Sequence, residues 1–302
     1  MPSNSSVRHF SKSKCQTLLI RLVLEEDRAR HDLTSRALLQ PGQRLRAAIR
    51  AKQPGIIAGA SICRDTFRAV DTRIRVTVQR RDGQPVRAGD TILTLHGPAR
   101  AMMAAERTAL NFLGHLSGVA TLTSRFVRQV KPHRVAILET RKTIPGLRDL
   151  EKAAVRAGGG HNHRLHLADA ILIKTNHLRA VTRDQWRVMS DQSITTAVAR
   201  ARRIRPKKFV EIEVTNFREL KAALSAKPDA ILLDNWRAPE IRRAVVLRNS
   251  SSLITHHSSL LEVSGGVTLA NVRRIAATGV ERISIGQLTH SAPALDVSLR
   301  IL

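Results

Sequence analysis

Two adjacent cations, Arg141 and Lys142, follow the apolar run 135–138 after Glu139 and Thr140, and they precede a Pro-Gly turn. Strand ends that open into a turn are where α/β enzymes place their reactive groups. Two fixed positive charges at such a point favour an anionic ligand. Five more short apolar runs each end in a polar or glycine-rich group. The pattern predicts one cavity mouth assembled from several strand ends.

Two carboxylates, Glu213 and Asp234, are expected at neighbouring strand ends of the same mouth. Carboxylate oxygens suit a divalent ion on a diphosphate, and they also bond sugar hydroxyls. Glu211 stands two residues before Glu213 and so lies on the same side of its strand. The alternative for either strand-end carboxylate is a structural salt bridge to Arg141 or Lys174 inside the barrel.

Glycine-rich groups follow the last two predicted strands. Ser264-Gly265-Gly266 precedes a predicted helix, so backbone N–H groups and the helix dipole can hold a phosphate there. Gly286 follows the next strand, and phosphate sites at the last two strands of such barrels are frequent. Either group alone is typical of a plain turn. Both together, on consecutive strands, favour phosphate binding.

A glycine run leads into the pattern His161-x-His163-x-x-His166, whose residue types are those of a metal site. The pattern lies in a loop, where the sequence does not fix ligand geometry. An anion-binding role for His163 and Arg164 fits the other cations better.

Alternating strands and helices from residue 119 onward predict a parallel sheet with right-handed crossovers. Strands are expected at 135–138, 170–174, 210–214, 230–234, 260–263 and 282–285, with helices near 120–130, 149–157, 193–204, 217–226, 239–247 and 268–278. Six or seven such units suit a closed or nearly closed α/β barrel better than an open sheet. The loops after the strands then form the active face.

The N-terminal part, residues 15–118, is predicted to be an α+β domain. It ends in a helix over 99–116 that carries Arg107, and Asp82-Gly83 is a strong hairpin signal. Residues 1–14 are expected to be a disordered leader, 119–288 the barrel domain, and 289–302 a C-terminal segment that returns to the N-terminal domain.

Composition narrows the class of protein. The net charge is +27, but the cations are spread along the 302 residues without a basic tail or interleaved aromatics. This favours a solvated surface over nucleic-acid binding. The positive charge would also steer an anionic substrate toward the protein. No apolar run approaches the roughly 18 residues of a membrane span. Two cysteines, Cys15 and Cys63, are too few for a disulfide framework and indicate a reducing, cytoplasmic compartment.

The chain resembles the quinolinate phosphoribosyltransferase family from about residue 18 to the C-terminus, and several of the shared motifs are long and specific. The segments that carry the resemblance are Glu25–Asp27, Asp32–Ser35, Ala105–Asn111, Thr140–Arg148, Gly158–Arg164, Leu172–His177, Glu211–Val214, Leu232–Asn235, Ser264–Gly266 and Thr289–Asp296. The resemblance implies an N-terminal open sandwich and a partly open, TIM-like barrel. It also implies a homodimer, or a higher oligomer, in which Arg107 reaches the partner's site.

The resemblance further implies a reaction. Quinolinate and phosphoribosyl diphosphate would give nicotinate mononucleotide, diphosphate and carbon dioxide, with Mg²⁺ as cofactor. Lys142, Lys174, Glu213 and Asp234 would be the catalytic groups, and the two carboxylates would reach the metal directly or through diphosphate or water. The substrate-binding set would be Arg107, Thr140, Arg141, Lys142, His163, Arg164, Lys174, Glu213, Asp234, Ser264, Gly265, Gly266, Ile285, Gly286 and Gln287.

Three positions depart from the family pattern. Thr175 stands where an Asp is usual, His166 where a Gly is usual, and Gln287 where a small residue is usual. Three alternatives stay open at this point: a related protein associated with molybdenum transport, a former enzyme scaffold that binds nucleic acid, and a metal hydrolase that uses His161 and His163.

Overall fold

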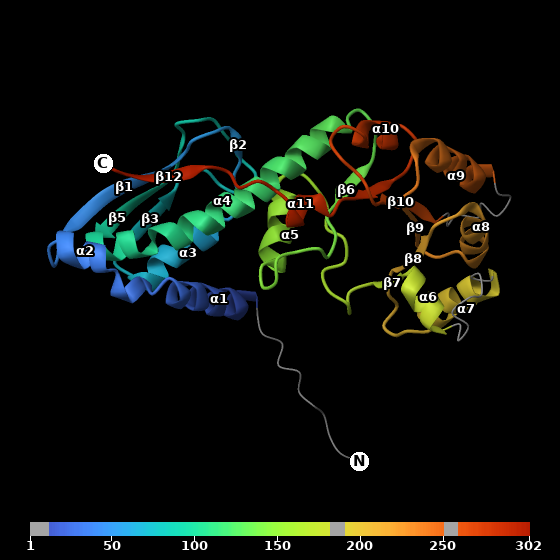
Figure 1. The fold of residues 1–302 in the computed structure, drawn as a ribbon, viewed down its shortest axis with the longest axis horizontal. Coiled ribbons are helices and arrows are strands. Elements are labelled where there is room, and N and C mark those ends of the chain that lie inside the picture. The colour runs from blue at the N-terminus through green and yellow to red at the C-terminus, as the bar shows by residue number, and fades with distance from the viewer. Residues whose placement is uncertain (1–11, 182–190, 251–258) are drawn as a thin grey trace, which may run out of the picture. The chain divides into compact units, whose positions relative to one another are not determined.

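The computed structural model describes residues 12–181, 191–250 and 259–302, and it divides into two compact units (Figure 1). The first unit extends to Thr121 and also contains Pro293–Leu302. The second unit is Leu122–Ala292. No helix in the described ranges is both long and apolar enough to cross a membrane.

The first unit is built on a four-stranded antiparallel sheet in the order β12-β1-β5-β3. Buried side chains such as Ile49, Phe67 and Leu93 form its core. Strand β12 is the C-terminal segment, which pairs with β1 at the edge of the sheet. The elements of this unit are α1 (Lys12–Glu26), η1 (Ala29–His31), α2 (Leu33–Leu38), β1 (Arg44–Ala51), β2 (Gly55–Ile56), α3 (Ala60–Val70), β3 (Arg75–Val78), β4 (Pro85–Val86), β5 (Thr91–Pro98), the greater part of α4 (Ala99–Gln129) and β12 (Val297–Ile301).

Helix α4 is continuous over 31 residues, so the predicted pair of helices, 99–116 and 120–130, is wrong. The glycines in this stretch do not end the helix. A Cβ at Gly118 would lie 2.2 Å from the carbonyl oxygen of Pro293, and one at Gly114 would lie 3.0 Å from that of Leu295. The Leu295 N–H also donates to the Gly114 carbonyl, at 2.9 Å. The glycines therefore let the C-terminal segment lie directly against the helix backbone.

The hairpin predicted at Asp82-Gly83 is also wrong. The flanking strands do not pair with each other, because β3 pairs with β5 and β4 pairs with β2. The Asp82 carboxylate instead accepts the N–H groups of Gly59 and Ala60, both at 3.0 Å, at the start of α3. Asp82 thus satisfies donors that the first turn of α3 leaves free. The leader predicted over residues 1–14 lies outside the described residues except for 12–14, which begin α1.

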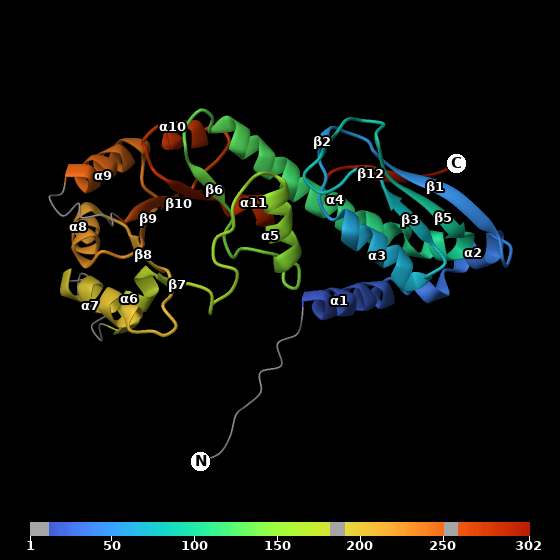
Figure 2. The same cartoon turned by 180° about the vertical axis from the view of Figure 1, so that it is seen from behind.

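The second unit is a six-stranded parallel sheet in the order β6-β11-β10-β9-β8-β7. Figures 1 and 2 show helices α7 to α10 along the outer side of this curved row of strands. The two end strands of the row, β6 and β7, do not pair with each other in the described residues, although a single bridge joins Leu138 to His161. The barrel is therefore partly open. Its elements are β6 (Ala136–Leu138), α5 (Arg148–Ala157), β7 (Ile171–Ile173), α6 (Thr175–Val181), α7 (Asp191–Arg202), β8 (Val210–Val214), α8 (Phe217–Ala226), β9 (Ala230–Asp234), α9 (Ala238–Ser250), β10 (Leu260–Ser264), α10 (Val272–Ala276), β11 (Arg282–Ser284) and α11 (Gln287–His290).

The six predicted barrel strands are confirmed, each to within one residue at either end. Their alternation explains where the polar groups lie. In β8, Val210, Ile212 and Val214 are buried, while Glu211 and Glu213 share the opposite face. Because the outer face is covered by helices, the inner positions toward the ends of the strands are left for polar side chains.

Candidate active site

A cavity of about 850 Å³ lies at the carboxyl ends of the barrel strands. All the barrel residues predicted from the sequence to bind substrate line this cavity: Thr140, Arg141, Lys142, His163, Arg164, Lys174, Glu213, Asp234, Ser264, Gly265, Gly266, Ile285, Gly286 and Gln287. Arg107 is exposed on α4 in the first unit. A larger hollow of about 1180 Å³ runs along α9, but it contains none of the predicted cations or carboxylates. The chemistry of the lining, rather than size, therefore identifies the site.

The cations of the cavity are poorly matched by protein anions. Arg141 has a buried Nε without a hydrogen-bond partner in the described part of the chain. Burial, and then the charge of Arg141, lower the pKa of the Arg164 guanidinium, whose Nη1 donates to the Ala170 carbonyl at 3.4 Å. Lys142 and Lys174 are exposed at the same mouth. Like charges held together in this way favour a multiply charged anion.

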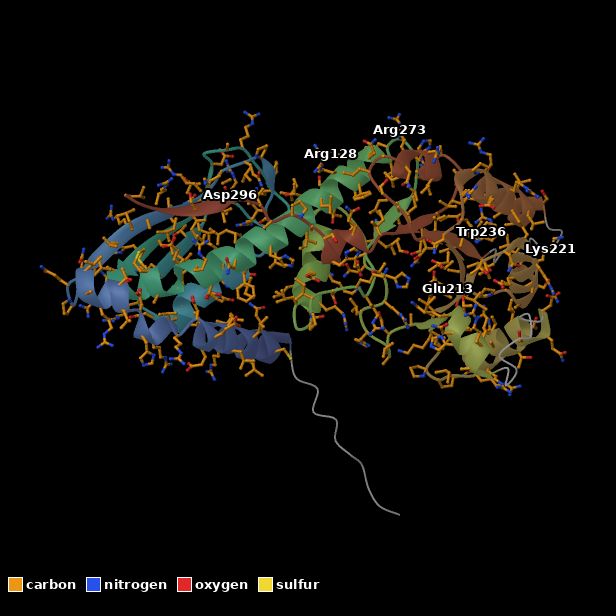
Figure 3. All side chains as sticks on the ribbon, viewed as in Figure 1. Arg128, Glu213, Lys221, Trp236, Arg273 and Asp296 are labelled. Atoms are coloured by element: carbon orange, nitrogen blue, oxygen red, sulfur yellow. The ribbon has the colours of Figure 1, made fainter. Side chains whose placement is uncertain are left out.

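The two strand-end carboxylates lie together in the cavity. Burial, and then the charge of Glu213, raise the pKa of Asp234. Glu213, labelled in Figure 3, accepts from the Thr175 hydroxyl at 2.7 Å, and Asp234 accepts from the Asn235 amide at 3.0 Å. Neither lies within salt-bridge distance of a cationic nitrogen in the described ranges, so the structure does not support the salt-bridge alternative.

These two carboxylates fit a role beside a divalent ion. They are hard oxygen donors that repel one another, which a nearby cation relieves. Within the described ranges they do not belong to a group of three protein ligands. Their arrangement suits an ion that takes most of its ligands from a bound diphosphate and from water.

The two glycine loops border the same cavity. Gly265 has a φ of +89° and Gly266 a φ of +60°, and both conformations are costly for other residues. A Cβ at Gly265 would lie 2.2 Å from Oδ1 of Asn235. Asn235 donates its N–H to the Ser264 carbonyl at 2.8 Å, and this bond joins the two strand ends. At Gly286, a Cβ would lie 3.0 Å from the Lys142 side chain.

His163 does not present a free ring nitrogen to the cavity. Its Nδ1 accepts the Arg164 N–H at 2.8 Å, and its Nε2 lies 2.9 Å from Glu211 and 3.4 Å from Glu262. The prediction of a direct bond from this ring to an anion is therefore not supported. His161 and His166 are exposed, and the three histidines do not form a ligand group in the described parts of the chain. The metal hydrolase alternative loses its basis.

Burial and the neighbouring groups act in opposite directions on the pKa of the His163 ring. Burial alone would lower the pKa of His163, but the contacts and charges of Glu211 and Glu262 outweigh burial and raise the pKa. The Arg164 N–H acts against this rise, because an imidazolium has no acceptor at Nδ1. The bond to Arg164 requires the neutral ring with its proton on Nε2.

The same geometry argues against a metal ion in this cluster. His163, Glu211 and Glu262 place ligand atoms within 4.8 Å of one another, as a metal site would. However, a neutral imidazole that accepts at Nδ1 carries its proton on Nε2, and a protonated Nε2 cannot bind a metal. The cluster is therefore a hydrogen-bonded one.

Sequence reasoning named Glu211 but missed that it belongs to a set of buried charges beneath the mouth. Glu139, Lys152, Glu211 and Glu262 are each at most 1% exposed. Lys152 contacts the Glu139 carboxylate and donates to the His163 carbonyl at 3.2 Å. For Glu211 and Glu262 a signal was present in the sequence, because each stands between apolar neighbours in a strand, where a charged residue is unusual unless it is paired.

The three departures from the family pattern fall at the site or near it. Thr175 donates its hydroxyl to Glu213, at 2.7 Å, and its N–H also approaches that carboxylate, at 3.3 Å. Thr175 therefore acts directly on the strand-end carboxylate of Glu213. Gln287 is exposed at the cavity, and His166 is exposed in the loop before β7.

Fold and site together define an α/β barrel enzyme that binds a multiply anionic substrate beside a phosphorylated one. Family models agree, with the quinolinate phosphoribosyl transferase N-terminal domain matching residues 32–117 and the C-terminal domain matching residues 119–300. The chain belongs to the quinolinate phosphoribosyltransferase family.

Individual relatives match nearly the whole chain. A probable nicotinate-nucleotide pyrophosphorylase (carboxylating) of Bacillus subtilis is 39% identical over 91% of this chain and 90% of its own length. The nicotinate-nucleotide pyrophosphorylase (carboxylating) of Mycobacterium leprae is also 39% identical, over 93% of this chain and 95% of its own length. The solved nicotinate-nucleotide pyrophosphorylase of Francisella tularensis superposes with a TM-score of 0.85 at 36% identity, covering 99% of this chain and 100% of that one.

Proposed function

We propose that this chain transfers the phosphoribosyl group of phosphoribosyl diphosphate to quinolinate, with loss of the 2-carboxylate as carbon dioxide, to give nicotinate mononucleotide for NAD biosynthesis. Membership of the family supports this reaction. The observation that carries it to specific residues is the convergence of Arg141, Arg164 and Lys174 with two carboxylates and two glycine loops around one cavity.

Quinolinate is an aromatic dicarboxylate, and the cationic side of the cavity suits it. Arg141 and Arg164 each have a planar guanidinium that can bind a carboxylate with two hydrogen bonds. The buried Nε–H of Arg141 has no acceptor among the described residues and can donate to the ligand. Lys174 adds a compact charge from the end of β7. These groups hold the ring so that its nitrogen faces the sugar carbon that it will attack.

Phosphoribosyl diphosphate occupies the opposite side in this proposal. The loops 264–266 and 285–287 take the 5′-phosphate on backbone N–H groups, and Lys142 lies beside the diphosphate. Glu213 and Asp234 face the ribose, where they stabilise the positive charge that builds on the sugar as the bond to diphosphate breaks. Mg²⁺, when bound with the diphosphate, makes it a better leaving group.

The second half of the reaction needs electrostatic help rather than covalent catalysis. After the ring nitrogen bonds to the sugar, the bond between C2 and its carboxylate breaks, and the electron pair stays on C2 until that carbon takes up a proton. The cations that bound the dicarboxylate remain around the ring and stabilise this electron-rich state.

We further propose a homodimer, or a higher oligomer, in which Arg107 of one subunit completes the quinolinate site of its partner. The motif 105–111 supports this assignment, and Arg107 is exposed on α4 and free to make such a contact.

We also propose that the protein works in a reducing, cytoplasmic compartment, since both cysteines are free thiols and Cys63 is buried.

Purified protein should form nicotinate mononucleotide only when quinolinate, phosphoribosyl diphosphate and Mg²⁺ are all present. Arg141→Ala and Lys174→Ala should each reduce turnover at least a hundredfold without a change in the melting temperature beyond a few degrees. Arg273→Ala is the matched control, because Arg273 is exposed on α10 outside the cavity (Figure 3). Turnover that survives in both cavity variants would remove the assignment.

A further inference from the structure

A chain of polar side chains, buried except for the partly exposed Arg282, runs across the barrel below the cavity. Arg282 on β11 donates its Nε to Glu262 on β10 at 2.6 Å, and these two residues are register partners in the sheet. The Arg282 guanidinium also lies over the Phe209 ring, at 5.4 Å. Glu262 is completely buried and reaches the ring of His163. Glu211, from β8, approaches the same ring nitrogen more closely, at 2.9 Å.

The backbone of His163 is fixed as firmly as its ring. Its N–H donates to Glu139 at 3.1 Å, and its carbonyl accepts from Lys152 at 3.2 Å. Glu139 follows β6 and Lys152 belongs to α5, so His163 is held by β6, α5, β8 and β10 together. Its side chain is only 9% exposed. Since Nδ1 faces the Arg164 N–H and Nε2 faces Glu211, the ring also has no free nitrogen for a ligand.

The bond that leads from this ring toward the cavity is the one to Arg164. Nδ1 of His163 accepts the Arg164 N–H at 2.8 Å, between consecutive residues. This bond fixes the backbone from which the Arg164 guanidinium reaches the cavity. A guanidinium that must meet a carboxylate in a bidentate way is sensitive to small changes in the position of its backbone.

We propose that Glu211, Glu262 and Arg282 are positioning residues that hold His163 and, through its Nδ1, orient Arg164 for quinolinate. The proposal rests on the proposed function, because quinolinate is the ligand that Arg164 would bind. Glu211, whose carboxylate lies 2.9 Å from Nε2, acts as the acceptor for the Nε2 proton, Glu262 lies 3.4 Å from the same nitrogen, and Arg282 keeps Glu262 in place. None of the three touches substrate.

Substitutions at Glu211 separate hydrogen bonding from charge. Glu211→Gln keeps an acceptor for Nε2 and removes the charge, whereas Glu211→Leu removes both at similar volume. The expected result is a quinolinate Kd within about threefold of wild type for Glu211→Gln and at least tenfold weaker for Glu211→Leu. The KM for phosphoribosyl diphosphate should stay within twofold in both variants. Quinolinate binding is measured by calorimetry without the second substrate, so no turnover occurs.

Glu281→Leu is the matched control for general destabilisation. Glu281 pairs with a buried arginine, Arg248, at 2.7 Å in the same barrel, and neither residue lines the cavity or contacts His163. Its substitution should lower the melting temperature and leave the quinolinate Kd unchanged. If Glu211→Gln weakens quinolinate binding as much as Glu211→Leu, the network acts by charge and the proposal is wrong. Equal weakening of both substrates would overturn it as well.

Nitrogen NMR of the His163 ring provides a readout that does not need activity. The ring should show a protonated Nε2 and an accepting Nδ1 in wild type and in Glu211→Gln, and an altered pattern in Glu211→Leu. A wild-type ring with its proton on Nδ1 would refute the network. Failure of the wild-type protein to bind quinolinate, with the expected His163 signals present, would count against the proposed function instead.

Discussion

Replacement of Gly265 by alanine tests how the phosphate loop is joined to the strand-end carboxylates. Gly265 has a φ of +89°, which costs an alanine roughly 1–2 kcal/mol. The new Cβ would also lie 2.2 Å from Oδ1 and 2.6 Å from Cγ of Asn235. Contacts this short cannot persist, so the loop or Asn235 must move. Relief of such a clash costs about another 1–3 kcal/mol.

Movement of Asn235 would disturb both sides of the substrate site. Its N–H is bonded to the Ser264 carbonyl, and its amide is bonded to Asp234. A displacement on the order of 1 Å in such a site lowers the rate about a hundredfold. Gly265→Ala should therefore lower kcat/KM for phosphoribosyl diphosphate about a hundredfold, while quinolinate binding changes little.

Gly266→Ala is the internal control. Gly266 has a φ of +60°, so the backbone cost is similar, but nothing lies within 4 Å of the added Cβ. Steady-state kinetics should show a loss of less than tenfold. The double variant Gly265→Ala with Asn235→Gly, which removes the atoms that the Cβ meets, should recover at least part of the rate. Equal losses in the two alanine variants would refute the steric reasoning.

Three further predictions concern other parts of the site. Glu139→Gln and Lys152→Met should each lower the free energy of unfolding by about 3–5 kcal/mol, because each leaves a buried partner unpaired. In urea titrations, the double variant should lose at least 2 kcal/mol less of its free energy of unfolding than the two single losses added together. Additive losses would contradict the pairing. Thr175→Val should lower kcat about threefold to tenfold with little change in either KM, because Glu213 loses a hydroxyl donor; an unchanged kcat would show that the contact is dispensable. Mixtures of inactive Arg107→Ala and Lys174→Ala subunits should regain up to about a quarter of wild-type activity if Arg107 acts across a dimer interface, and inactive mixtures would contradict that assembly.

The barrel could be predicted from the sequence because its signals are local. Each strand is a short apolar run, and each ends in a residue type that water or a ligand must satisfy. Arg141, Lys174 and Asp234 are therefore identified by their position alone, and the parallel order of the strands brings them to one mouth. The family resemblance added specific roles for the same positions.

The parts that could not be predicted depend on contacts between distant segments. The inward orientation of His163 is set by Glu211 and Glu262, which belong to two other strands. Gly118 resembles a helix terminator until Pro293 is seen against it. Asp82-Gly83 has the residues of a hairpin turn, but its carboxylate caps a helix that precedes it in the chain. In each case a long-range partner outweighs the local preference.

The most direct test of the account is the location of quinolinate in crystals of the protein soaked with quinolinate alone. The account predicts the dicarboxylate in the 850 Å³ cavity, with its two carboxylates on Arg141, Arg164 and Lys174. Quinolinate bound elsewhere, or a cavity that stays without it at concentrations well above the Kd in solution, would contradict the central claim that these cations form its site.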